Sequence, residues 1–233
     1  PIFAEFGSAD QQAALLPGVI AGETILTAAL SEGGDGLAPA VPATVATADG
    51  DGWRLTGTKA LVPAAHLAHR VLVPARTGDG TSTVFLVDPE ADGVTREVSR
   101  STNLEPLTTL VFDGVVVGAA DVLGTVDGGA DVVAWIEPRA IAATAALQAG
   151  VCEAATRLTA TYTSERRQFD TPIATFQAVA HRAADAYIDT EAVRLTARQA
   201  AWRLAEGLPA AEQVAIAKFW AADGAHRVVH AAQ

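Results

Sequence analysis

The sequence predicts an α+β fold in which a small antiparallel β-domain lies between two helical parts. Two changes in composition support this prediction. Residues 1–23 have the pattern of a short helical segment, and residues 24–124 are rich in Val, Thr, Gly and Pro. Residues 125–233 are rich in Ala and contain few turn signals. We therefore expect the end of one helical domain, a central β-domain and a second helical domain.

Turn residues predict the elements of the first two parts. A helical stretch around residues 11–16 is followed by Pro17 and Gly22. Farther along, Asp-Gly-Asp-Gly at 49–52 separates two short runs that favour strands, which is the pattern of a β-hairpin. We expect further strands at 70–75, 83–87 and 110–117, with a turn at 77–80.

Three long helices are predicted in the last part, at about 130–163, 174–206 and 210–233. Breaks at 168–172 and 207–209, each containing Pro, separate them. Ala at many positions lets helices approach closely, as in a four-helix-bundle-type domain. We expect the Ala-rich stretches 140–155 and 194–205 to be buried between subunits.

Composition excludes several classes of function. A net charge of -11 argues against a nucleic-acid partner, because polyphosphate binding requires clustered Lys and Arg. The single Cys152 cannot form an intramolecular disulfide and fits a reducing compartment, so we expect a cytoplasmic protein. The most apolar stretch, 140–155, is shorter than the roughly 20 residues of a membrane span. The chain has no Met and ends at Gln233 without a cap, and we expect it to be a fragment.

Two histidine pairs have spacings that suit a metal ion. They are His66 with His69, and His226 with His230. Neither pair has a third ligand or an acidic residue beside it in the sequence, as a zinc site requires. We predict no metal site.

The break between the first two predicted helices carries a distinctive motif. Residues 166–173 read Arg-Arg-Gln-Phe-Asp-Thr-Pro-Ile, and Phe176-Gln177 and His181 follow. This order resembles the signature of the acyl-CoA dehydrogenase family, in which Arg-x-x-Phe-Gly, Pro-Ile and Phe-Gln follow one another. Further landmarks agree in order and spacing: residues 10–23, Gly52-Trp53 to Lys59, Gly129, Gly150 and Gln233.

The resemblance implies an architecture and an activity. In that family a helical domain, a β-domain and a C-terminal four-helix bundle follow one another, and subunits assemble as a dimer of dimers. FAD binds between the β-domain and the bundle, and its ADP half reaches a neighbouring subunit. The family removes a proton and a hydride from an acyl-CoA thioester, with a glutamate as the base. Electrons then pass to an electron-transferring flavoprotein.

The resemblance also implies cofactor-binding residues. Arg166 corresponds to an arginine on the FAD pyrophosphate, a contact that suits a guanidinium; otherwise Arg166 is a solvated arginine at a helix end. Phe169 either lies against the adenine or is an ordinary core residue. Ser31 corresponds to a threonine that bonds the flavin ring, although a plain turn serine is the alternative. The remaining candidates, near the ADP moiety, are Gln168, Gln177 and Gln233.

At three places the sequence departs from the family pattern. Residues 33–38 read Gly-Gly-Asp-Gly-Leu-Ala and lack a serine expected near the thioester. Residues 61–63 read Leu-Val-Pro where the family usually has Trp-Ile-Thr, and Pro63 offers the flavin neither N–H nor hydroxyl. Ala140 stands where one class of members keeps the catalytic glutamate on the central helix. Glu137, three residues earlier, is expected to cap or solvate the helix start, and the catalytic residue stays unknown.

These departures leave two main hypotheses. In the first, which we favour, the chain is a non-catalytic partner in a heteromeric acyl-CoA dehydrogenase. Another subunit then supplies the base and the intact flavin pocket, as in the heteromeric actinobacterial enzymes that act on steroid side-chain thioesters, which the sequence resembles. In the second, the chain is self-sufficient and its glutamate lies beyond Gln233. A flavin oxidase or monooxygenase on the same fold is a third possibility.

Overall fold

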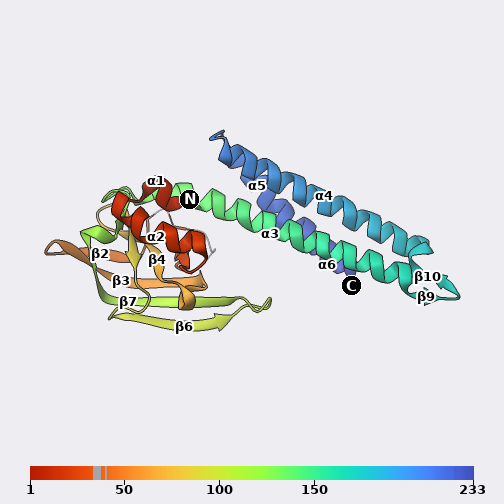
Figure 1. The fold of residues 1–233 in the computed structure, drawn as a ribbon, viewed down its shortest axis with the longest axis horizontal. Coiled ribbons are helices and arrows are strands. Elements are labelled where there is room, and N and C mark those ends of the chain that lie inside the picture. Colours follow the sequence, from red (N-terminus) through yellow and green to blue (C-terminus); the bar gives the residue numbers. More distant parts are fainter. Residues whose placement is uncertain (34–37, 40) are drawn as a thin grey trace. The chain divides into compact units, whose positions relative to one another are not determined.

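The computed structural model describes residues 1–33, 38–39 and 41–233. The chain divides into two compact units, Pro1–Ile136 and Glu137–Gln233, and the division falls inside the long helix α3, Gly129–Glu165 (Figure 1). No helix in the described part of the chain is long and apolar enough to cross a membrane.

Two helices open the first unit, α1 (Ile2–Phe6) and α2 (Ala9–Ala21). The side chain of Ser8 accepts a hydrogen bond from the backbone N–H of Gln11, and the Gln11 side chain accepts one in return, so a capping box starts α2. The helix ends where Gly22 takes a left-handed conformation with φ of 77°. The predicted helical segment is therefore present, and it continues through Pro17.

The β-part of this unit forms one sheet of eight strands among the described residues. The strands pair in the order β6-β7-β3-β2-β4-β5-β8, and β1 pairs with β4. Short 3-10 turns, η1 (Ala65–Leu67) and η2 (Ala119–Asp121), connect some of them. The strands are β1 (Leu26–Ala28), β2 (Val45–Asp49), β3 (Gly52–Pro63), β4 (Arg70–Arg76), β5 (Ser82–Val87), β6 (Val94–Arg100), β7 (Pro106–Gly118) and β8 (Val122–Leu123).

The hairpins that the turn residues predicted are confirmed. Strands β2 and β3 pair antiparallel around Gly50 and Asp51, and Gly50 has a φ of 59° that suits such a turn. Most pairings in the sheet are antiparallel, but β1 pairs with β4 in parallel, which local patterns did not predict. Pro74 of β4 has no N–H to donate, but this removes no hydrogen bond to β1, because β1 pairs only with Arg70–Leu72.

Strands β4 and β5 are buried on both faces and separate two cores. One core contains Val71, Val73 and Phe85 and continues to residues of β3 and β7. The other contains Leu72 and Val84, which pack with Phe3 of α1 and with residues at the start of α3. Alternate side chains of one strand thus serve opposite faces, as the two-residue period of a strand requires.

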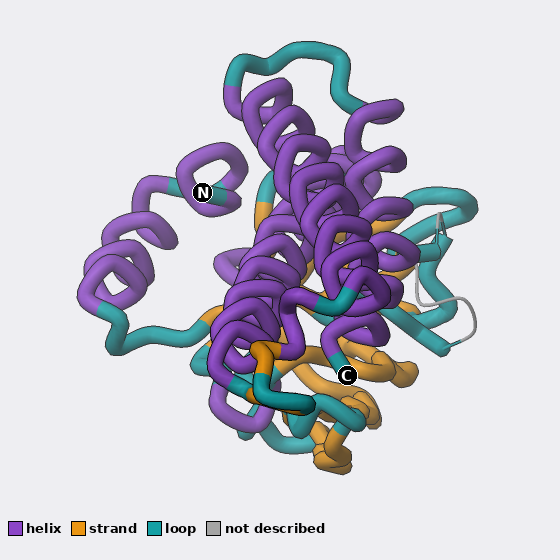
Figure 2. Tube along the Cα trace, turned by 90° about the vertical axis from the view of Figure 1, so that its right-hand side faces the viewer, coloured by secondary structure: helices purple, strands orange, loops and turns teal. Residues whose placement is uncertain are grey.

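The second unit contains the rest of α3 and the helices that follow it. After α3 come the short strands β9 (Arg167–Gln168) and β10 (Thr171–Pro172) and a 3-10 turn, η3 (Ile173–Thr175). Helix α4 spans Gln177–Ala205, and α5 (Ala211–Phe219) continues through a π turn (Trp220–Gly224) into α6 (Ala225–Ala232). The three predicted helices are confirmed, and Figure 2 shows the helices bundled together.

Small side chains form the core of this unit. Ala142 and Ala145 of α3 pack with Ala197 and Ala200 of α4, and farther along the free Cys152 is fully buried among small apolar residues. Helices with Ala at the contact can approach closely. Part of the Ala-rich stretches is therefore buried within one chain, whereas Ala140, Ala143, Ala146 and Ala201 are exposed beside larger apolar residues, so their burial between subunits stays a prediction.

Candidate functional site

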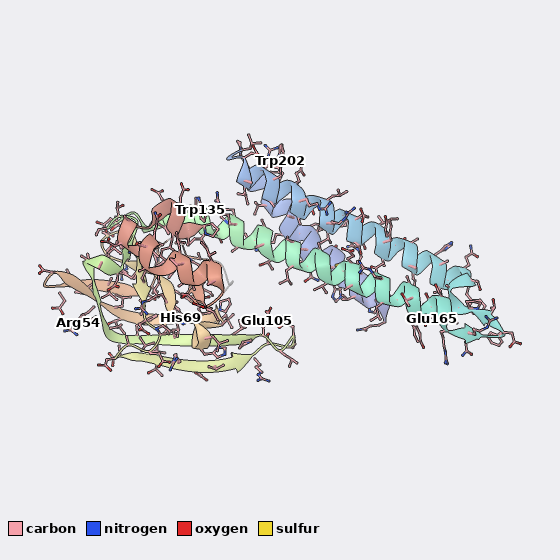
Figure 3. All side chains as sticks on the ribbon, viewed as in Figure 1. Arg54, His69, Glu105, Trp135, Glu165 and Trp202 are labelled. Carbon is pink, nitrogen blue, oxygen red and sulfur yellow. The ribbon has the colours of Figure 1, made fainter. Side chains whose placement is uncertain are left out.

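The Arg-rich turn after α3 has a rigid backbone. The backbone N–H of Arg166 donates to Tyr162 O at 2.8 Å, and the Ile173 N–H donates to Arg166 O at 2.8 Å. Strands β9 and β10 pair beyond it and close a two-residue hairpin. Figure 3 labels Glu165 at the end of α3 beside this turn. Hydrogen bonds thus hold the backbone of Arg166 on both sides, and its side chain is exposed.

The two arginines of the turn differ in what their guanidinium groups bind. Nη2 of Arg167 donates to Asp170 O at 2.5 Å, which holds the hairpin. Within the described part of the chain, the exposed Arg166 side chain forms neither an ion pair nor a hydrogen bond. A fixed backbone with an unused guanidinium suits an anionic ligand. The geometry is compatible with the predicted pyrophosphate contact and also with the alternative of a solvated arginine at a helix end, so the role of Arg166 stays a prediction.

Phe169 is not a core residue. It is 92% exposed, and its ring centroid lies 6.5 Å from that of Phe176. Phe169 and Asp170 both have positive φ, 52° and 62°, as a tight two-residue hairpin turn requires. Asp tolerates this conformation better than most residues, which explains how Asp170 can replace the family's glycine. The exposed ring is available for an adenine, so the core alternative for Phe169 is wrong.

The predicted glutamines lie near this turn or line a groove connected to it. Gln168 in β9 and Gln177 at the start of α4 are exposed. Gln233 lines a groove of about 660 Å³ together with Ile173, whose N–H binds Arg166 O. The groove is also lined by Thr156, Leu158, Thr159, Ala160, Tyr162, Thr163, Val179, Arg182, Ala183, Ala186, Tyr187, Ala231 and Ala232.

Ser31 lies in the first unit, directly before a buried ion pair. Its Oγ accepts from the Gly33 N–H at 3.3 Å, and its carbonyl oxygen accepts from Ala60 N–H at 2.9 Å. The bond to Gly33 is one that an ordinary turn serine makes. Within the described part of the chain the hydroxyl donates no hydrogen bond, so a donor remains for a ligand.

Glu32 and Lys59 form the ion pair beside Ser31. Lys59 Nζ lies 2.7 Å from Glu32 Oε1, and the two side chains are 0% and 10% exposed. Glu32 also accepts from the backbone N–H groups of Ala43 (2.6 Å) and Thr44 (2.9 Å). Burial would raise the pKa of Glu32, but these hydrogen bonds outweigh it, so the pKa is lowered. Burial lowers the pKa of Lys59, and Glu32 offsets part of this effect.

Residues 61–63 have no side chain that could donate a hydrogen bond to a flavin ring. Leu61 has a φ of 55° at an irregularity in the β3–β7 pairing and is 54% exposed. Pro63 lacks an N–H, and its carbonyl oxygen accepts from Thr27 Oγ1 at 2.7 Å. The departure noted in residues 33–38 lies largely outside the described residues, since the structure describes only Gly33 and Ala38 of that stretch.

Of the two candidate positions for a base on α3, Ala140 has no carboxylate and Glu137 has one, a turn away from the position where the family keeps its glutamate. Ala140 is exposed, and its carbonyl oxygen accepts from Thr144 Oγ1 at 2.9 Å. Because α3 begins at Gly129, Glu137 lies two turns inside the helix and cannot cap its start, so that part of our expectation is wrong. The expectation rested on Pro138, a residue favoured near helix starts, but α3 runs through it.

The residues present fit one half of an FAD molecule better than the other. On the second unit, an unused guanidinium, an exposed ring and exposed amides suit a nucleoside diphosphate. On the first unit, Ser31 keeps a hydroxyl, but Pro63 has no group to donate. For metals, His69 Nδ1 already accepts from the Ile25 N–H at 3.0 Å, and the described residues contain no cluster of three or more metal-ligating side chains.

Sequence reasoning missed the Glu32–Lys59 pair and the groove residue Arg182. A Lys at a position of β3 that faces the core, in alternation with Leu55, is a signal that a charged partner must be buried with it. Arg182 gave no comparable signal, because many arginines on a helix are simply solvated.

The chain matches known proteins over nearly its whole length. Residues 27–115 match the family profile described as acyl-CoA dehydrogenase, middle domain, and residues 129–233 match acyl-CoA dehydrogenase, C-terminal domain. Acyl-CoA dehydrogenase FadE27 of Mycobacterium tuberculosis is 40% identical over 236 residues, which cover 97% of this chain and 60% of the relative.

Solved structures agree with these matches. The ChsE4–ChsE5 complex from Mycobacterium tuberculosis is 41% identical with a TM-score of 0.87, over 99% of this chain and 60% of that chain. Butyryl-CoA dehydrogenase from Megasphaera elsdenii is 28% identical with a TM-score of 0.91, over 99% and 62%.

A β-unit followed by an Ala-rich helical unit, with an arginine-bearing turn after the first long helix, is the arrangement of an acyl-CoA dehydrogenase-like fold. The chain belongs to the acyl-CoA dehydrogenase family, a family of oxidoreductases. It spans about 60% of the length of the curated relatives that it matches.

Proposed function

We propose that the chain is part of a non-catalytic subunit in a heteromeric, FAD-dependent acyl-CoA dehydrogenase. Its role is to bind the ADP half of the FAD whose flavin ring lies in a partner subunit. FAD, when bound, accepts the hydride of α,β-desaturation. The observation that carries the proposal is the contrast between the two halves of the site: Arg166 is presented and unused, whereas Pro63 cannot donate.

Each half of the contrast has a physical basis. The Arg166 guanidinium can make charge-assisted hydrogen bonds to a pyrophosphate, worth about 1.5–3 kcal/mol. At the other half, a flavin ring beside Pro63 would lose a donor that the family supplies there. Ala140 also supports a non-catalytic role. Removal of the α-proton of a thioester needs a positioned carboxylate, and the methyl group of Ala140 cannot accept that proton.

The partner subunit would then supply the base and the intact flavin pocket. A complex of two different polypeptides is named for one structural relative, which supports a heteromeric assembly. We propose an acyl-CoA thioester as substrate and an electron-transferring flavoprotein as acceptor, as is typical of the family. A net charge of -11 disfavours nucleic acid as a further partner.

The test is to produce the full-length polypeptide alone and together with a neighbouring acyl-CoA dehydrogenase subunit. Each preparation is assayed with a ferrocenium acceptor on straight-chain, branched and steroid-derived CoA esters, and FAD is counted per polypeptide. We expect turnover only in the mixed assembly, with about one FAD for two polypeptides because one ring pocket is incomplete.

The variant Arg166→Ala tests the ADP contact in the same assembly. Losing a charge-assisted contact should weaken FAD binding about 10- to 150-fold. Arg157→Ala is the matched control, because Arg157 is an exposed arginine of α3 that pairs with Glu153 one turn away. Turnover by the lone subunit, abolished by mutating a glutamate beyond Gln233, would instead establish the self-sufficient enzyme.

A further inference from the structure

Helices α5 and α6 form one continuous helix with a π turn between them. The π turn is recognised by a hydrogen bond from the backbone N–H of Ala225 to the carbonyl oxygen of Trp220, five residues earlier. A π turn inserts one extra residue into an α-helix and shifts the face that the following residues present. Such turns are rare in proteins, and those that occur are often at functional sites. The contacts that stabilise this π turn can therefore indicate a function.

The Trp220 ring fills the π turn. A Cβ on the buried Gly224 would lie 2.9 Å from Trp220 Cε3 and 3.3 Å from Val193 Cγ2, so only glycine lets the helix come this close to α4. The guanidinium carbon of Arg227 lies 5.6 Å from the centroid of the Trp220 ring, in cation–π contact. The Trp220 ring therefore packs against both the backbone of Gly224 and the guanidinium group of Arg227.

Arg227 also links the π turn to α4 through hydrogen bonds to Asp189. Its Nε and Nη2 donate to the two carboxylate oxygens of Asp189 at 2.8 and 2.9 Å, and its Nη1 donates to Asp223. A bidentate pair fixes direction as well as distance, which a single ion pair does not. Asp189 belongs to the same part of α4 as Arg182 and Tyr187, which line the groove.

The end of α6 carries Gln233 to that groove. Helix α6 has only eight residues, and Gln233 lies roughly 9 Å along the axis from Arg227 at 1.5 Å per residue. At its end, Thr159 Oγ1 donates to Ala232 O at 3.3 Å. Because the helix is short, the contacts at the π turn contribute to its rotation together with the bond from Thr159, and a small rotation at the π turn would shift Gln233 relative to the groove.

We propose that Arg227 is a positioning residue, which fixes α6 through Asp189 and Trp220 and thereby holds the Gln233 amide at the groove beside the Arg166 turn. The inference rests on the proposed function, in which that turn binds the ADP half of FAD. Arg227 itself touches neither the groove nor the turn, and acts only through Gln233.

A double-mutant cycle on FAD affinity separates this role from general stabilisation. The apo form of the full mixed assembly is titrated with FAD for wild type, Gln233→Ala, Arg227→Gln and the double variant. Loss of one neutral hydrogen bond should weaken binding by about 2- to 10-fold in Gln233→Ala. Arg227→Gln should also weaken FAD binding, by no more than Gln233→Ala does, and the double variant should match Gln233→Ala alone.

Two further arms complete the test. Hydrogen exchange of the amides of residues 228–232 should speed up in Arg227→Gln whether or not FAD is present. The exposed control Arg157→Gln should change neither quantity. Effects of Arg227→Gln and Gln233→Ala that simply add, or an unchanged FAD affinity in either, would overturn the inference. If Arg166→Ala still weakens FAD binding in that case, the proposed function stands, whereas a wild-type assembly that binds no FAD would refute the proposed function.

Discussion

At the scale of single residues, the buried Glu32–Lys59 pair makes the clearest prediction. Removing one partner of a buried pair costs about 3–5 kcal/mol, because the other charge is left without compensation. Glu32→Gln should therefore destabilise the protein strongly at neutral pH. Urea unfolding measures this, and Glu90→Gln is the control, since its pair with Arg96 is exposed and such pairs contribute about 0–1 kcal/mol.

The direction of the Glu32 pKa adds a pH dependence. Its folded pKa lies below the ordinary value of 4.5, so its contribution to stability is complete above pH 4.5 and is lost as pH falls through the folded pKa. A protonated Glu32 resembles Gln, so the difference between wild type and Glu32→Gln should shrink in acid. Burial also lowers the pKa of Lys59, so alkaline pH should restore part of the variant's stability. A difference that stays constant from neutral to acid pH would contradict this account.

The placement of the candidate site residues was predictable where a motif fixed their order along the chain. Arg166, Phe169 and Gln177 lie at or next to one turn, as their spacing suggested, and Phe169 is exposed, whereas their contacts with FAD stay predictions. Glu32 and Lys59 are 27 residues apart, and no local pattern indicates which carboxylate a buried lysine will find. Pairing over such a distance depends on the register of the sheet.

At the scale of elements, two helical glycines should respond to alanine in opposite directions. Gly224→Ala places a methyl group 2.9 Å from a ring carbon of Trp220, and overpacking of this kind costs about 1–3 kcal/mol. Gly150 in α3 has nothing within 4 Å of an added Cβ, so Gly150→Ala should stabilise by up to about 1 kcal/mol through helix propensity. Thermal unfolding of both variants and of the wild type measures whether each substitution lowers or raises the stability.

The predictability of the elements follows the range of the interactions that form them. The hairpin at Gly50 and the three long helices depend on nearby residues, and both were predicted. Strand β6 was missed because Val94–Arg100 is mostly polar and exposed, and only its pairing with β7 makes it a strand. The parallel pairing of β1 with β4 joins residues 44 positions apart, so it too could not be inferred from local sequence.

At the scale of the whole molecule, the exposed apolar face of α4 makes a prediction about assembly. Ile188, Leu195 and Trp202 are spaced by seven residues and are 63%, 57% and 55% exposed, so they share one face of the helix. Figure 3 labels Trp202 near the C-terminal end of α4. Monomeric proteins rarely expose a contiguous apolar patch of this kind. We expect a partner subunit to pack on these larger side chains, because such a contact would remove the apolar face from water.

We therefore expect Leu195→Lys to weaken association of the full-length assembly. A charge at the centre of an apolar contact should cost at least about 2 kcal/mol, or roughly a 30-fold rise in the dissociation constant. Light scattering on a dilution series measures this. The matched control is Leu104→Lys, because Leu104 is 71% exposed on the turn between β6 and β7 and lies outside the stripe. An unchanged mass for Leu195→Lys across dilutions at which wild type begins to dissociate would show that another surface joins the subunits.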